Sequence, residues 1–98
     1  MIFSEKYSQL NQAFGAYVAT RDIEDISEEE AVVDYASRAS LEELNSALVQ
    51  IDDLLCIPEH WTAALNMANL FIETSPEKRE WFEMVKRVLI EEKSKRSH

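Results

Sequence analysis

The chain has 98 residues, of which 46% are hydrophobic and 30% charged, a composition typical of one folded domain rather than of a disordered segment. Its formal net charge of −9 argues against direct binding to nucleic acid, because that ligand is itself negatively charged. One cysteine excludes an intramolecular disulfide, and one glycine and two prolines are too few for the turns of a β-sandwich or barrel.

Apolar residues recur at helical spacing through nearly the whole chain. In the first expected helix they form a single stripe: Tyr7, Leu10, Phe14 and Tyr17. Gly15 lies inside this helix, where it costs about 1 kcal/mol relative to Ala, and it therefore indicates a close packing contact. Ser27 and Glu30 have the three-residue spacing of a capping box and predict the start of a second helix, which ends near Arg38.

Three more helices are expected in the second half of the chain. A second capping box, Ser40 with Glu43, predicts the start of the third helix. Pro58 ends that pattern and opens a fourth helix, and Ser75 with Pro76 opens a fifth. We expect the fourth helix to be the most buried element, since its polar stripe is narrow beside its apolar residues: Trp61, Ala64, Leu65, Ala68 and Phe71.

Together these elements predict an all-α fold, in which residues 1–98 form one compact domain of about five helices joined by short connections. Residues 92–98 are expected to form a frayed or disordered tail. The first residues lack the basic and apolar regions of a signal peptide, and no apolar run approaches the roughly 20 residues of a membrane span. We therefore expect a cytoplasmic protein that makes no membrane contact.

The excess negative charge is confined to the middle third of the chain. Residues 1–20 and residues 54–98 each sum to zero, whereas residues 21–53 hold eleven acidic side chains against Arg21 and Arg38. Five of these acids lie in expected first turns of helices, where the helix dipole stabilises each by about 0.3–1 kcal/mol. Six have no such explanation: Asp22, Glu24, Asp25, Asp34, Asp52 and Asp53. A solvated acidic face and a surface that binds a basic protein both fit this pattern, and we favour the second.

The sequence offers no convincing catalytic or metal-binding pattern. If Asp22 began a calcium loop, Ser27 would stand where glycine is required and Val33 where a bidentate Glu is required. Cys56 and His60 are four residues apart, but a proline separates them and two leucines precede the cysteine, so we expect a buried structural thiol. We therefore predict a protein that is not an enzyme, with no catalytic residues, no cofactor, no metal site and no small-molecule ligand.

Five runs of residues stand in an order that resembles one protein family. They are residues 10–17 (LNQAFGAY), 29–35 (EEAVVDY), 40–44 (SLEEL), 50–55 (QIDDLL) and 80–85 (EWFEMV). The chain resembles the contact-dependent growth inhibition (CDI) immunity proteins of bacteria over roughly residues 10 to 90. It departs from the family pattern at residues 18–22, which replace an aromatic-His-Gln-Asp run.

The resemblance implies a non-catalytic antidote that binds the C-terminal toxin domain of a bacterial delivery protein, commonly a nuclease. We expect this partner to be basic, because a nuclease needs a cationic groove for its phosphate substrate, and we expect the antidote to block that groove. The candidate toxin-binding residues are Asp22, Glu24, Asp25, Glu30, Asp34 and Trp61. Trp61 is included because side chains at a helix start are often partly exposed. The free protein is expected to be a monomer or a weak dimer. The alternative is an acidic helical adaptor or DNA mimic that sequesters a basic host protein.

Overall fold

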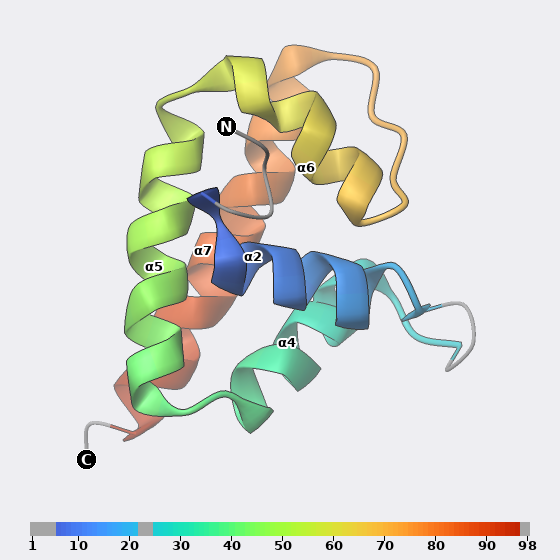
Figure 1. Ribbon diagram of the computed structural model, residues 1–98. Coiled ribbons are helices and arrows are strands. Elements are labelled where there is room, and N and C mark those ends of the chain that lie inside the picture. Colours follow the sequence, from blue (N-terminus) through green and yellow to red (C-terminus); the bar gives the residue numbers. More distant parts are fainter. Residues whose placement is uncertain (1–5, 22–24, 97–98) are drawn as a thin grey trace.

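The structure, a computed structural model, describes residues 6–21 and 25–96. Over these residues the chain is all-α, as the sequence predicts, and has no strand (Figure 1). The elements are α2 (Ser8–Gln12), the π-helix η1 (Ala13–Val18), α4 (Glu28–Arg38), α5 (Leu41–Leu55), the 3₁₀ turn η2 (Pro58–His60), α6 (Trp61–Met67) and α7 (Ser75–Arg96). Among the helices of this described part, none combines the length and the apolar character needed to cross a bilayer.

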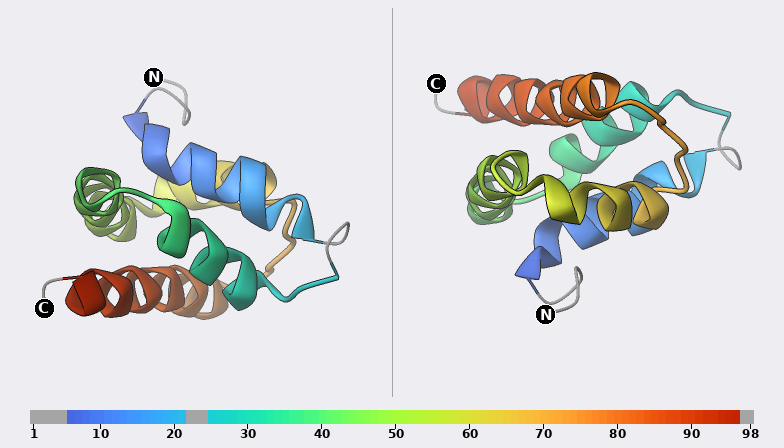
Figure 2. Two further views of the ribbon diagram at one scale, coloured as in Figure 1. Left: turned by 90° about the horizontal axis from the view of Figure 1, so that it is seen from below. Right: turned by 90° about the horizontal axis from the view of Figure 1, so that it is seen from above.

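Two long helices form the frame of the molecule. α5 and α7 lie side by side and run in opposite directions (Figure 1). α2 continues into η1 as one rod that contacts α5, while α4 packs against both η1 and α7 (Figure 2). These elements enclose a single core, to which η1 and each α-helix contribute. Its largest fully buried side chains include Leu10, Phe14, Leu44, Ile51 and Phe82.

Both predicted helix starts in the acidic segment are confirmed, but the two caps differ. At α5 the capping box is complete, since the Ser40 hydroxyl accepts from the Glu43 N–H at 3.1 Å and the Glu43 carboxylate accepts from the Ser40 N–H at 2.9 Å. At α4 the Ser27 hydroxyl accepts from the Glu30 N–H at 3.1 Å, and the Glu30 carboxylate does not return the bond. The Glu30 side chain is therefore left exposed to solvent.

The first predicted helix is divided into α2 and the π-helix η1. Gly15 lies in η1, and a Cβ atom at this position would lie 3.3 Å from the Sδ of Met67 in α6. This distance is tighter than ordinary van der Waals contact, so the predicted close packing at Gly15 is confirmed. The absence of a side chain there lets the η1 rod approach α6 closely.

The fourth predicted helix is shorter than the sequence indicates. α6 ends at Met67, because Asn69 adopts a left-handed backbone with φ 58°. The stripe that should have continued to Phe71 is thereby broken, and the Phe71 side chain is 91% exposed. The prediction that Phe71 belongs to the buried stripe is therefore wrong, although α6 itself buries three of its seven residues, the largest share among the described α-helices.

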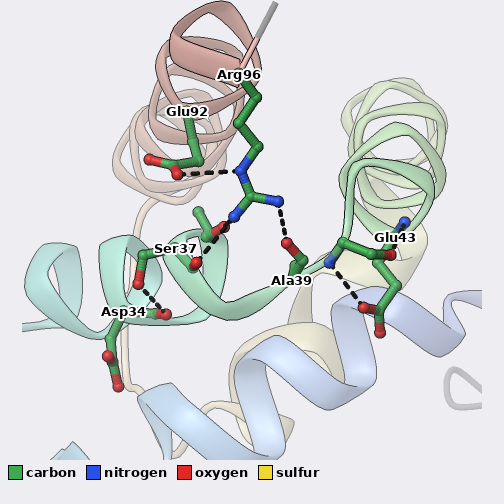
Figure 3. A network of polar contacts seen from close by, with 8 residues as sticks. Asp34, Ser37, Ala39, Glu43, Glu92 and Arg96 are labelled. Atoms are coloured by element: carbon green, nitrogen blue, oxygen red, sulfur yellow. Dashed lines mark hydrogen bonds and ion pairs between the residues drawn. The ribbon is translucent and has the colours of Figure 1, made fainter.

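α7 continues to Arg96, beyond the point at which the sequence predicts a frayed tail. The Arg96 guanidinium pairs with Glu92 at 3.3 Å and reaches across to the last carbonyls of α4 (Figure 3). It donates to the Ala36 oxygen at 2.8 Å, to the Ser37 oxygen at 2.9 Å and also to the Ala39 oxygen. Helix C-termini leave four carbonyls without intrahelical partners. From a distant part of the chain, Arg96 satisfies two of those of α4, at Ala36 and Ser37, together with the carbonyl of the C-cap residue Ala39.

Candidate functional site

Two of the predicted binding residues come together at a shallow hollow on the outer face of α4. The hollow has a volume of about 430 Å³ and is lined by Ile26, Glu29, Glu30, Val33, Asp34, Ser37 and Arg38. These residues recur at steps of three and four, so one stripe of the helix forms the hollow. Val33 is an exposed apolar residue with carboxylates on either side of it along the stripe.

A second hollow, of about 420 Å³, lies where the N-terminal half of α7 meets the start of α4. Its lining is Ser27, Glu28, Glu29, Ile72, Glu77, Glu80, Trp81 and Met84. Glu29 lines both hollows, which makes them one continuous region. We call this region the acidic surface and define it as the residues that line the two hollows. It combines carboxylates with the exposed parts of Ile72, Trp81 and Met84.

Among the described residues, no cation lies within ion-pair distance of most carboxylates of the acidic surface. Glu29 pairs with Arg87 at 2.5 Å, and Asp34 pairs with Arg38 at 3.0 Å. The others make no ion pair with any residue among 6–21 and 25–96: Glu28, Glu30, Glu77 and Glu80. Like charges held close together repel one another, so the approach of a cationic group lowers the electrostatic free energy of this region.

Two other acids of the middle segment, Asp52 and Asp53, are engaged elsewhere. Asp52 pairs with Lys86 of α7 at 2.5 Å. Asp53 accepts a hydrogen bond from the Tyr7 hydroxyl at 2.8 Å and lies 3.4 Å from the Lys6 ammonium. The hydrogen bond from Tyr7 is the main reason that the pKa of Asp53 falls below its usual value. These contacts join α5 to neighbouring segments, and neither aspartate lines the acidic surface.

The six candidate residues have different positions in the structure. Asp22 and Glu24 lie outside the described residues. Asp25 is exposed, with a left-handed backbone at φ 57°, and it immediately precedes Ile26 in the first hollow. Glu30 and Asp34 line that hollow.

The sixth candidate, Trp61, lies in the core, so the expectation that it is partly exposed is wrong. Its side chain is only 4% exposed, and the indole N–H donates to the Leu54 carbonyl at 2.8 Å. Its ring also lies 5.8 Å from that of Phe82. α6 begins against the end of α5, and this contact turns the first side chain of the helix inward rather than toward solvent.

The contribution of α7 to the acidic surface could not be seen from the summed charge of residues 54–98. Acids and bases balance over that segment, and Lys78 and Arg79 stand between Glu77 and Glu80, so the acidic character appears only when the faces of α7 are considered separately. A helical wheel does carry the signal, since Glu77, Glu80, Trp81 and Met84 follow one another at steps of three, one and three and so share a face. Ile72 could not be assigned to the surface without knowing where α6 ends.

Tyr35 and Cys56, two residues with titratable side chains, lie outside the acidic surface. Within the described residues no group of three or more His, Cys, Asp or Glu side chains could hold a metal ion. Burial and the nearby Glu43 carboxylate raise the pKa of Tyr35 to about 12, but Tyr35 lines neither hollow. Cys56 is exposed at the C-terminal end of α5, so the predicted burial of its thiol is wrong.

Comparison with known proteins adds no family assignment. No family model, curated protein or solved structure matches the chain significantly.

Proposed function

We propose that the protein is an immunity protein of the CDI type, which binds a basic toxin domain and blocks its phosphate-binding groove. The single observation that carries the proposal is the acidic surface, where partly or fully exposed apolar side chains lie beside four carboxylates that form no ion pair within the described part of the chain: Glu28, Glu30, Glu77 and Glu80. A nuclease groove presents the complementary field, because it must attract phosphates. The order of motifs along the chain gives independent support.

The two components of the acidic surface have different roles in binding. Unpaired surface carboxylates steer a basic partner and can raise association to about 10⁸–10⁹ M⁻¹s⁻¹ at low salt. An antidote must capture each toxin molecule before the toxin acts, so fast association has a direct purpose. The apolar side chains between the carboxylates supply the area that excludes water and keeps the complex together.

The proposal expects that the gene for this chain lies beside one that encodes a large secreted protein, and the first test uses the C-terminal domain of that protein. That domain, produced alone, should arrest bacterial growth, and co-production of this protein should restore growth and give a one-to-one complex. A domain that neither binds this protein nor is neutralised by it would overturn the proposal. Binding to a host DNA-binding protein but not to that domain would instead support the adaptor function.

The second test locates the binding region. Glu30→Lys should slow association with the toxin domain at low salt, and the loss should shrink as salt screens the charge. Glu42→Lys is the matched control, because Glu42 is also an exposed glutamate in the first turn of a helix but lies outside the acidic surface. Equal association rates for the two variants would exclude the acidic surface as the docking region.

A further inference from the structure

Phe71 is exposed because the end of α6 forces it outward. The Leu70 N–H donates to the Leu65 carbonyl at 2.9 Å and the Asn69 N–H to the Asn66 carbonyl at 3.1 Å, the pair of bonds that closes a helix through a left-handed residue. Leu70 then turns into the core, and the next side chain, Phe71, turns to solvent.

The backbone that leads to Phe71 is held by a second helix. The Arg21 guanidinium donates to the Ala68 carbonyl at 3.1 Å and to the Asn69 carbonyl at 3.4 Å, and it also donates to the Val18 carbonyl at the end of η1 at 2.8 Å. Arg21 therefore ties the end of α6 to η1. An aromatic side chain on a backbone fixed in this way loses little conformational freedom when a partner covers it.

Phe71 borders the acidic surface. It lines a hollow of about 170 Å³ whose apolar walls include Leu65, Leu70 and Ile72, and Ile72 also lines the acidic surface. The segment that carries it, drawn in light orange, lies on the same side of the molecule as the starts of α4 and α7 in Figure 1 and in both views of Figure 2. Because Ile72 lines both hollows, a partner that covers the carboxylates at the start of α7 reaches the edge of the hollow that Phe71 lines.

We propose that Phe71 is the apolar anchor with which the acidic surface holds its basic partner, the ring entering an apolar depression beside the partner's cationic groove. This inference rests on the proposed function and names the residue that sets the lifetime of the complex. Charge complementarity identifies the occupant, because the hollow beside the ring, lined by Glu73 and Lys78, adjoins the hollow that holds Glu77 and Glu80. In a symmetric dimer the same patch would face itself, so these glutamates would repel one another, whereas a basic polypeptide satisfies them.

The carboxylates and the Phe71 ring should affect different rate constants, which binding kinetics can separate. Carboxylates at the rim of an interface act mainly on the association rate and its salt dependence, while a desolvated aromatic anchor acts on the dissociation rate. Phe71→Ala should therefore raise the dissociation rate of the toxin-domain complex about tenfold or more. The association rate should change less than about twofold, and its dependence on salt should stay that of the wild type.

The experiment measures binding of the toxin domain to the wild type, Phe71→Ala and Val49→Ala by surface plasmon resonance over a salt series. Val49 is the matched control, since it is 70% exposed on α5 and lines neither the acidic surface nor the hollow beside Phe71. Val49→Ala should leave both rates unchanged. Both variants should keep the wild-type melting temperature, because neither removes a buried side chain.

Three outcomes would overturn the inference. A complex whose lifetime is unchanged in Phe71→Ala would exclude the anchor and leave the proposed function intact. A wild-type dimer that Phe71→Ala converts to a monomer, seen by analytical ultracentrifugation, would assign the ring to self-association. A wild-type protein that binds no toxin domain would remove the proposed function, and this inference with it.

Discussion

Arg87 of α7 donates through Nη2 to Glu29 of α4 at 2.5 Å and through Nη1 to Glu91, one turn further along α7, at 3.2 Å. The two carboxylates raise the pKa of Arg87, which therefore stays charged. Because Glu29 lines both hollows, this guanidinium places a positive charge beside the middle of the acidic surface. The negative potential there is consequently weaker than the number of glutamates indicates.

Arg87→Gln should therefore make the protein a faster binder of the basic toxin domain, although it removes two ion pairs. Loss of the positive charge deepens the potential of the acidic surface, and we expect association to rise about twofold to fivefold at low salt. Lys95→Gln changes the net charge equally but lies in the last turn of α7, so its effect should be smaller. Stopped-flow association rates measure both variants, and a slower rate for Arg87→Gln would contradict the expected sign.

The sequence alone locates this surface only in part. Helices and their caps follow from local signals, and Ser27 and Ser40 begin α4 and α5 as predicted. Which charged side chains form ion pairs does not follow from local signals, because the partner of a charged residue can come from any part of the fold. Lys86 and Arg87 are assigned by sequence to a balanced segment, yet in space they neutralise Asp52 and Glu29.

Burial is harder to predict from the sequence than helicity, because it also depends on contacts between segments. Trp61 begins a helix, which favours exposure, but the contact between α6 and the end of α5 decides its environment. Phe71 continues an apolar stripe, which favours burial, but one left-handed residue, Asn69, ends the stripe before it. The burial of Trp61 depends on tertiary packing, which a single sequence does not contain. The exposure of Phe71 does have a local signal, since Asn is one of the few residues that adopt a left-handed backbone readily.

Trp61→Phe should lower stability without affecting partner binding. Phenylalanine keeps most of the buried ring but removes the indole N–H, which leaves the Leu54 carbonyl without that donor in the core. The Leu54 carbonyl keeps the hydrogen bond from the Ile57 N–H at 3.1 Å, so the variant loses one hydrogen bond, which is worth about 0.5–1.5 kcal/mol. Urea unfolding followed by circular dichroism measures the loss, and calorimetric titration with the toxin domain measures affinity. A variant of normal stability with weakened binding would place Trp61 at the interface after all.

Asp53→Asn should make the protein less sensitive to acid. The hydrogen bond from Tyr7 lowers the pKa of Asp53 in the folded state below the value of 3.8 that it has when exposed. A lowered pKa means that the carboxylate stabilises the fold fully above pH 3.8, and that this contribution is lost as pH falls through the folded pKa. The variant should therefore be less stable than the wild type near neutral pH and should lose stability less steeply below pH 3.8.

The control for this pH dependence is Glu43→Gln. The backbone hydrogen bond at Ser40 is the main cause that lowers the pKa of Glu43 from 4.5, so this variant should flatten the stability curve from that higher pH downward. Urea unfolding over about pH 2 to 7 resolves the pH ranges of the two carboxylates, since each makes the stability depend on pH only below its own unfolded pKa. Superimposable pH profiles for the wild type and Asp53→Asn would exclude the Tyr7–Asp53 contact as a source of stability.

Arg96→Ala should destabilise the junction between α4 and α7 although the residue stands near the end of the chain. The substitution removes the donors to the carbonyls of Ala36, Ser37 and Ala39 together with the ion pair to Glu92 (Figure 3). Hydrogen bonds from charged donors are worth about 1.5–3 kcal/mol each, but the side chain is partly exposed and water replaces some of them, so we expect a total loss of about 1–3 kcal/mol. Arg96→Lys should recover only part of this loss, because an ammonium lacks the planar fork that reaches several carbonyls at once. Hydrogen exchange at the end of α4 separates this role from fraying of α7 itself: a local clamp speeds exchange in α4, whereas a freely fraying tail leaves α4 unchanged.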